Sequence, residues 1–232
     1  MCPPAPFLIP GLAPNLLAAA ADVADASRCA VTELADVDRI VVLAEAARWR
    51  RLAPGTRLSG AAFGRSDLPS VPPVTLPGAP TTRSAVASPP AVVAAYLLTG
   101  GGLREPAEVA ELAPGDAERA AELLAALPGT VGVLAMADGA AAHGPNAPLA
   151  QDERAELVDD RLAAALVAGN PAALAAATDH RELLSSVGVA AGEVFRVLAR
   201  LPAPHTAELL ARDAPFGVGY LVATWSYRTE GR

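Results

Sequence analysis

The chain has 232 residues, a formal net charge of −7 and no lysine, so all 18 basic residues are arginines. This length suits one large core, and we expect a single domain over residues 1–232. Nucleic-acid binding requires clustered cations, and the chain has no basic stripe, so the sequence argues against a nucleic-acid partner.

The first part of the chain is rich in proline. Prolines interrupt the apolar run up to Pro14, and no basic residue precedes Arg28. This pattern argues against a signal peptide, and we find no apolar stretch long enough to span a bilayer. We therefore expect a soluble, cytoplasmic protein with no membrane partner. Cys2 and Cys29 are too few for a disulfide framework.

Predicted elements in the first half alternate with long irregular stretches. The prolines of Cys2–Pro14 predict an extended loop, and Asn15 can cap an alanine-rich helix that runs to Ala26. The β-branched run Ile40–Ala44 predicts a buried strand. Residues 54–90 are rich in Pro, Gly, Ser and Thr and predict a loop with one weak strand at Leu58–Phe63.

The second half of the chain predicts helices that alternate with two buried strands. The strands are Thr130–Ala137 and Val218–Trp225. Four predicted helices are Pro90–Leu98, Asp116–Leu127, Arg181–Val187 and Glu193–Leu201. Asp152 and Glu153 open another helix, and Asn170 caps a further one. Strands separated by helices predict a three-layer α/β/α domain with a central, mostly parallel sheet.

Candidate site residues gather in the loop that follows the strand Thr130–Ala137. Ligands of open α/β sheets bind at the carboxyl ends of the strands, and this loop carries Asp138 and His143. Asp138 is either a site acid or part of an Asp-Gly turn, and His143 either lines a pocket or is exposed. His180 and His205 are expected to be exposed.

Three segments resemble the class III extradiol ring-cleavage dioxygenase family, the LigB-like proteins, and in particular a branch found in GC-rich actinobacteria. They are Cys2-Pro3-Pro4-Ala5-Pro6-Phe7-Leu8-Ile9-Pro10, Met136-Ala137-Asp138-Gly139 through Asp152-Glu153-Arg154-Ala155, and Ala214-Pro215-Phe216-Gly217-Val218-Gly219-Tyr220-Leu221-Val222-Ala223. The resemblance implies a mixed central sheet with helices on both faces.

The resemblance also implies what an active site would need. Members of the family bind Fe(II) through two histidines and a glutamate, and a further histidine acts as acid and base. At the first ligand position this chain has Pro4, or Cys2 on a looser alignment, and at the second it has Ala44-Glu45-Ala46. The acid/base element matches Asp138 onward, with His143 displaced, and the metal carboxylate matches Glu193.

The missing histidines leave three hypotheses of function. The first is a LigB-like domain without a metal or cofactor, which has lost ring cleavage and acts as a binding or structural protein. Pro4, Glu45, Glu193 and Tyr220 would then line a pocket for a small aromatic ligand. The second is an active dioxygenase that cleaves a catechol-like ring with Fe(II) held by His143 and Glu193. The third is a metal-free hydrolase or lyase that uses Asp138 and His143.

For several of these residues the sequence also offers a structural role. Glu193 opens a helix, where a carboxylate stabilises the helix dipole, and Tyr220 alternates with apolar residues as core residues do. A homo-oligomer is also compatible with the sequence.

Overall fold

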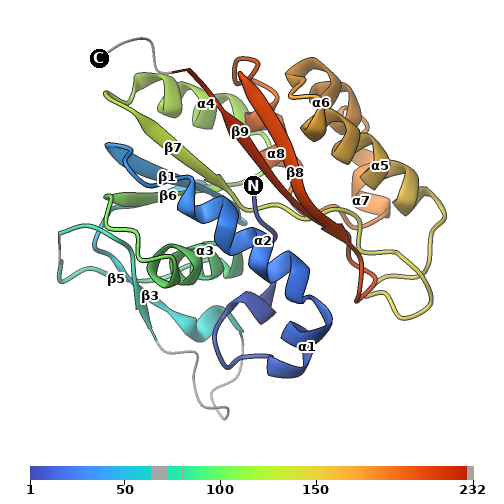
Figure 1. The fold of residues 1–232 in the computed structure, drawn as a ribbon, viewed down its shortest axis with the longest axis horizontal. Helices are drawn as coiled ribbons and strands as arrows, with labels where there is room; N and C mark the ends of the chain where they lie inside the picture. The colour runs from blue at the N-terminus through green and yellow to red at the C-terminus, as the bar shows by residue number, and fades with distance from the viewer. Residues whose placement is uncertain (64–72, 80, 229–232) are drawn as a thin grey trace.

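We describe the protein from a computed structural model that covers residues 1–63, 73–79 and 81–228. Its main sheet has the strand order β2-β6-β1-β7 (Figure 1). Strand β1 (Arg39–Glu45) is central and pairs in parallel with β6 (Ala107–Leu112) and β7 (Val131–Ala135). The short strand β2 (Arg50–Leu52) pairs antiparallel with β6 at the edge. The sheet is therefore mixed.

Strand β1 is buried on both faces, as its continuous apolar run predicts. Ile40, Val42 and Ala44 belong to one core cluster, and Val41 and Leu43 belong to a second. Because successive strand residues point to opposite faces, the two clusters cover the two faces of the sheet. The expectation of a mixed α/β fold is confirmed.

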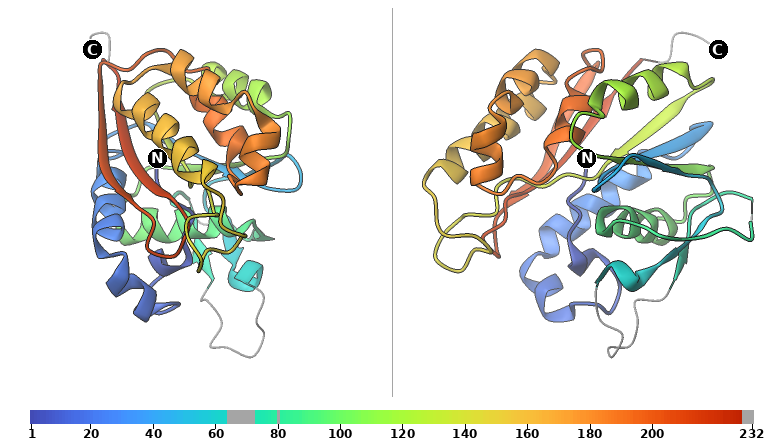
Figure 2. Two further views of the ribbon diagram at one scale, coloured as in Figure 1. Left: turned by 90° about the vertical axis from the view of Figure 1, so that its right-hand side faces the viewer. Right: turned by 180° about the vertical axis from the view of Figure 1, so that it is seen from behind.

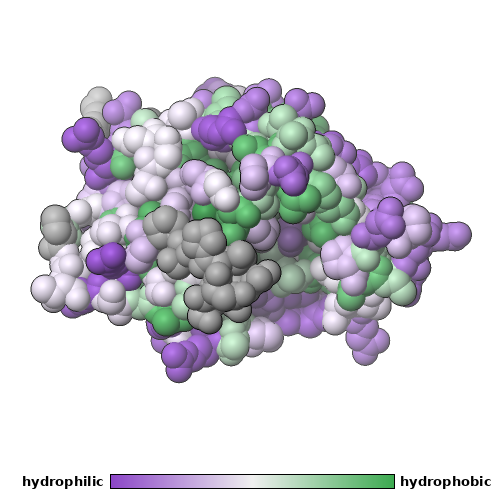
Figure 3. Space-filling model, turned by 90° about the horizontal axis from the view of Figure 1, so that it is seen from below, coloured by the Kyte–Doolittle hydropathy of each residue, from purple (hydrophilic) through white to green (hydrophobic). Residues whose placement is uncertain are grey.

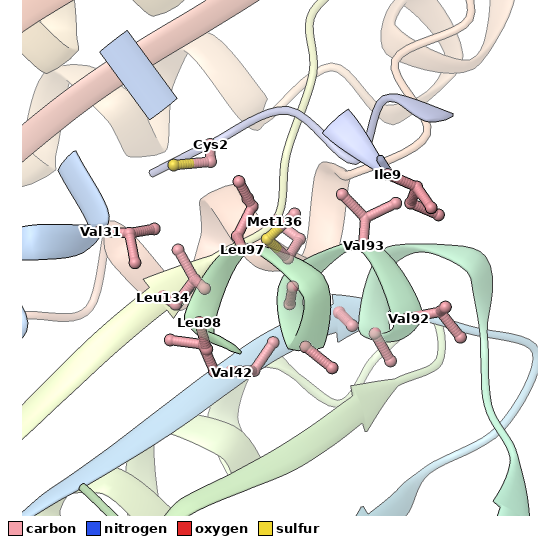
Figure 4. Packing of buried hydrophobic residues seen from close by; sticks show 14 of the residues in the cluster. Cys2, Ile9, Val31, Val42, Val92, Val93, Leu97, Leu98, Leu134 and Met136 are labelled. Carbon is pink, nitrogen blue, oxygen red and sulfur yellow. The ribbon is translucent and has the colours of Figure 1, made fainter. Parts of the chain in front are cut away.

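Helices supply the other side of each core cluster. The first cluster includes residues of α2 (Ala21–Thr32) and α3 (Pro89–Gly100). The second includes residues of α4 (Ala117–Ala126), α5 (Arg154–Val167) and α8 (Gly192–Leu198). Figure 4 shows Leu97 and Leu98 of α3 beside Val42, Leu134 and Met136, and Val93 of the same helix beside Ile9.

A hairpin of β8 (Thr206–Asp213) and β9 (Tyr220–Ser226) lies beside this sheet. It has α2 on one side and α5 on the other (Figure 2). Tyr220 and Val222 belong to the first core cluster, and Leu221 and Ala223 belong to the second. The predicted buried strand near the C-terminus is therefore confirmed.

The first two residues connect β7 to the hairpin. The Cys2 amide donates to the Ala135 carbonyl at 3.0 Å, and Cys2 forms a parallel bridge with Met136. Met1 and Ala223 exchange two hydrogen bonds, in which the Met1 amine donates at 2.6 Å and the Ala223 amide at 3.2 Å. The predicted loop at Cys2–Pro14 thus begins with strand-like pairing.

The remaining elements are shorter. They are η1 (Pro6–Leu8), α1 (Pro14–Ala19), β3 (Arg57–Ser59), η2 (Gly60–Phe63), β4 (Val74–Thr75), β5 (Ser84–Val86), α6 (Pro171–Thr178) and α7 (Arg181–Ser186). The predicted helix from Asn15 is two helices, α1 and α2, separated at Ala20. Part of the predicted loop 54–90 lies outside the described residues.

Strand β6 was not predicted, because its glutamates suggest an exposed segment. Glu108 and Glu111 are buried, and their partners come from the edge strand β2. Arg51 binds Glu108 and Arg50 binds Glu111, each at 2.6 Å. Glu111 also accepts the Ser88 amide at 2.6 Å.

Within the described residues, no helix is long and apolar enough to cross a bilayer.

Candidate functional site

The loop that follows β7 carries the predicted site residues. It leaves the carboxyl end of the strand after Met136 and Ala137, which are both buried, and reaches α5 at Arg154. The molecule is hollowed when seen from below, and mostly hydrophobic residues surround the hollow (Figure 3). The loop lies toward this lower face (Figure 1).

His143 pairs with an acid on α5 that sequence reasoning missed. His143 Nε2 lies 2.7 Å from Asp159 Oδ2, and the Asp159 side chain is 3 % exposed. Asp159 Oδ1 accepts the Ala140 amide at 2.8 Å, which fixes the carboxylate against the loop. His143 Nδ1 has no hydrogen-bond partner among the described residues. This nitrogen is therefore available to a ligand.

The sequence does carry a signal for Asp159. Its neighbours at helical spacing, Ala155, Leu162 and Leu166, are all buried, so position 159 falls on the inward face of α5. A carboxylate on an apolar helix face requires a buried partner, and here that partner is His143.

Two glycines leave the space that Asp159 occupies. The Gly139 amide donates to the Gly219 carbonyl at 2.6 Å, and the Gly219 amide donates to the Ala140 carbonyl at 2.8 Å. A Cβ atom on either glycine would overlap the Asp159 carboxylate. The Gly217 carbonyl accepts the His143 amide at 3.0 Å. The segment before β9 therefore holds the loop in place through the backbone of Gly217 and Gly219. The lack of a side chain at Gly219 allows this close approach.

Asp138 lies close to this pair and has a shifted pKa, and two further groups with raised pKa values interact with Asp138. Burial raises the pKa of Asp138 to about 7, and the nearby Asp159 charge adds to the shift. Burial also raises the pKa of Glu45, at the end of β1, to about 7, with contributions from the charges of Glu193 and Asp138. Burial and the Asp138 charge raise the pKa of Tyr220 to about 12. The structure thus brings Glu45 and Tyr220 each within electrostatic reach of Asp138.

Tyr220 is also part of an aromatic cluster. The ring centroids of Phe7 and Tyr220 are 5.4 Å apart in an edge-to-face arrangement. Phe216 lies 6.1 Å from Phe7 and 6.4 Å from Tyr220. Phe7 and Tyr220 are buried and Phe216 is half-buried, so the cluster joins η1 to the start of β9. As expected of a core residue, Tyr220 packs against neighbours of this kind.

Glu193 is held by cations and belongs to the packing of α8. Its Oε1 binds Arg181 at 2.8 Å and Arg196 at 2.9 Å. Its Oε2 accepts the Ala117 amide at 3.3 Å, and its own amide donates to Glu45 at 3.4 Å. A carboxylate engaged by two arginines offers little to a metal ion.

The remaining candidates are simpler. Pro4 is half-buried in the N-terminal segment, and its side chain has no atom that could bind a metal. His180 and His205 are exposed, as predicted.

We tested whether these residues suit the Fe(II) that the resemblance implies. A two-histidine, one-carboxylate site needs two imidazole nitrogens aimed at one point. His143 Nε2 faces Asp159, and Glu193 faces two arginines. Over residues 1–63, 73–79 and 81–228, no three His, Cys, Asp or Glu side chains are grouped so that they could hold a metal ion. The donor set does not fit the family's iron site.

Comparisons with known proteins add little. No family model matches the chain, and no curated protein matches it. Among solved structures, it is similar to the uncharacterized protein JW3007 from Escherichia coli K12, with 12 % sequence identity and a TM-score of 0.46. That alignment covers 85 % of this chain and 89 % of the other. No functional conclusion follows from a similarity at this level.

Proposed function

We propose that this protein is a three-layer, LigB-like α/β/α domain that has lost iron-dependent ring cleavage and binds a small aromatic ligand. The proposed ligand carries a hydroxyl group and occupies the hollow at the carboxyl edge of the sheet. The observation that carries the proposal is the 2.7 Å contact between His143 and Asp159. This contact commits the one histidine of the loop to a carboxylate and leaves Nδ1 for a ligand.

The chemistry of the surrounding groups supports a phenolic ligand. When His143 is neutral, its bond to Asp159 keeps the proton on Nε2, so Nδ1 accepts a hydrogen bond from a ligand hydroxyl. Asp138 has a pKa of about 7, so near neutral pH it can donate or accept. Tyr220, whose pKa responds to the Asp138 charge, packs against Phe216, and Phe216 is half-buried, so its ring is the one of the aromatic cluster that can contact an aromatic ligand.

A catechol binding test checks this proposal. Binding of catechol to the whole chain is followed by ligand-observed NMR, with His143→Ala as the test variant and His180→Ala as a matched control. Loss of one hydrogen bond, worth about 1 kcal/mol, weakens binding roughly fivefold to tenfold in His143→Ala and leaves His180→Ala unchanged. Equal binding by all three proteins would refute the site.

The same preparation separates binding from ring cleavage. The protein is loaded with Fe(II) without oxygen, and oxygen uptake with catechol is then measured. We expect no catechol-dependent uptake and far less than one iron per chain. Near-stoichiometric iron with oxygen uptake that requires His143 would show instead a dioxygenase with a non-standard metal site.

The His143–Asp159 pair also favours a second candidate, a metal-free hydrolase or lyase. In such an enzyme His143 would act as a general base oriented by Asp159, with Asp138 as the acid. Hydrolysis of aryl esters provides the test. Hydrolysis faster than the uncatalysed rate in the native chain, retained in His180→Ala and lost in His143→Ala, would favour this enzyme over a binding protein.

A further inference from the structure

Asp138 and Tyr220 lie opposite each other on two antiparallel segments. The Gly139 amide in the loop after β7 donates to the Gly219 carbonyl, and four residues further along the loop donates to the Gly217 carbonyl, which lies earlier in the chain. The two segments therefore run antiparallel. Asp138 directly precedes Gly139 and Tyr220 directly follows Gly219, so the two side chains are cross-strand neighbours, whose Cβ atoms are typically about 5 Å apart.

The two side chains occupy the face of this strand pair that points away from Asp159. A Cβ atom on either of the glycines beside them would overlap the Asp159 carboxylate, so the glycine positions point toward α5. Because side chains alternate between the faces of a strand, Asp138 and Tyr220 point the other way. Tyr220 accordingly belongs to the first core cluster. The site that Asp138 and Tyr220 form is therefore separate from the contact between His143 and Asp159.

Neither side chain has a hydrogen-bond partner from another described residue. Tyr220 is 6 % exposed, and its hydroxyl makes no hydrogen bond within the described part of the chain. The Asp138 carboxyl contacts its own backbone amide, and the residue is half-buried, so a ligand can reach it. A buried hydroxyl that lacks a partner is costly, and a ligand atom that accepts its hydrogen would remove that cost.

The surroundings keep both groups protonated and uncharged near pH 6. Burial, with a contribution from the charge of Asp159, raises the pKa of Asp138 to about 7. Burial and the Asp138 charge raise the pKa of Tyr220 to about 12, so its hydroxyl keeps its proton. Glu45 also interacts with Asp138, and Asp159 is paired with His143. Because most of these neighbours are acids, they repel an anionic ligand but not an uncharged one.

Two neighbouring O–H donors suit a single ligand oxygen. A carbonyl oxygen accepts hydrogen bonds along both of its lone-pair directions, and a carboxylic acid that burial keeps neutral can donate one of them. The half-buried ring of Phe216 packs against Tyr220, with centroids 6.4 Å apart, and offers contact to an aromatic ring.

We propose that the Asp138 carboxyl and the Tyr220 hydroxyl bind the carbonyl oxygen of an uncharged aromatic ketone or aldehyde. Each group donates one hydrogen bond to that oxygen, and the ligand ring lies against Phe216. This inference rests on the proposed function only for the aromatic character of the ligand, and it does not require His143.

Matched small probes test this proposal on the whole chain. Acetophenone, ethylbenzene and benzoate share one aromatic ring and differ in the group that would meet the two donors. By ligand-observed NMR at pH 6, acetophenone should bind at least tenfold more tightly than ethylbenzene and more tightly than benzoate. Equal binding of acetophenone and ethylbenzene, no binding of any probe, or tightest binding of benzoate would overturn the proposal. Catechol binding that depends on His143 would still support the proposed function in each of these cases.

Conservative variants assign the preference for acetophenone to the two groups. Tyr220→Phe keeps the ring in the aromatic cluster and removes only the hydroxyl, so the preference should fall about fivefold while ethylbenzene binding stays unchanged. Asp138→Ala should act in the same way, whereas Asp138→Asn keeps a donor and should retain the preference. Tyr227→Phe is the control, because Tyr227 is exposed. An unchanged preference in Tyr220→Phe would show that the hydroxyl does not bind the carbonyl oxygen.

The pH dependence provides a second measurement, because neither acetophenone nor ethylbenzene titrates. Asp138 loses its proton as the pH rises through about 7, so at pH 8 roughly a tenth of the native chain still holds the donor. The preference for acetophenone should therefore fall severalfold between pH 6 and pH 8 in the native chain and stay constant in Asp138→Asn. A preference that is constant with pH in both proteins would exclude the Asp138 carboxyl as a donor.

Discussion

Gly219 lies directly against the carboxylate of Asp159, so that a Cβ atom on Gly219 would overlap it. We therefore expect Gly219→Ala to displace α5 or the loop and to destabilise the fold by about 1–3 kcal/mol. Urea denaturation measures the change. Gly100→Ala is the matched control, because a Cβ there meets no atom within 4 Å, and it should be close to neutral. Equal stability of the two variants would contradict the close approach.

Asp138 should make stability depend on pH. Its pKa rises from 3.8 to about 7 on folding, so between these values the folded chain binds more protons than the unfolded chain. Stability contributed by this group is therefore present at pH 4 and is lost as the pH rises through 7. Asp138→Asn should remove the loss and raise the free energy of unfolding by about 1–2 kcal/mol at pH 8, with little change at pH 4.

The control for this prediction is Asp22→Asn, because Asp22 is exposed. Urea denaturation of each protein at pH 4 and pH 8 gives the comparison. If Asp138→Asn destabilises the protein equally at both pH values, the carboxyl group of Asp138 is not held in its protonated form near neutral pH.

The two arginines that bind Glu193 should differ in importance. Arg196 is 13 % exposed and Arg181 is 57 % exposed. Removing the more buried partner leaves Glu193 short of a cation in the core, so Arg196→Ala should cost about 2–4 kcal/mol, whereas Arg181→Ala should cost less than about 1 kcal/mol. Thermal unfolding ranks the variants. The reverse order would mean that Arg181 is the main partner of Glu193.

The aromatic cluster gives a test of the N-terminal segment. Phe7 is buried and contacts both Phe216 and Tyr220, so Phe7→Ala should cost about 3–4 kcal/mol. Phe216 is half-buried, so Phe216→Ala should cost less. Chemical denaturation compares them. A neutral Phe7→Ala would show that the N-terminal segment does not contribute to the core.

Local patterns predict the central strands and most helices. The buried run at Ile40–Ala44 gives β1, and the predicted strand Thr130–Ala137 contains β7. Asn170 caps α6 as predicted, accepting the Ala173 amide at 3.0 Å. In each case the signal lies within a few neighbouring residues.

Elements that depend on distant partners could not be predicted in this way. Glu108 and Glu111 of β6 are buried because arginines of β2 bind them, more than fifty residues earlier in the chain. The site shows the same limit: the sequence indicates His143 and Asp138, but the acid that binds His143 comes from α5. Glu193 lies in the first turn of α8, as its structural interpretation from the sequence predicts, and its carboxylate is held by two arginines.

The paired charges at β2 have a consequence for behaviour at high concentration. An edge strand presents free amides and carbonyls to other chains, and aggregation can start there. Arg50 and Arg51 hold the nearly buried carboxylates of Glu111 and Glu108, so a chain that displaced β2 would leave both acids without their cations. That cost opposes the replacement of β2 by a strand of another chain, and replacing both arginines with threonine should therefore promote slow formation of β-rich aggregates.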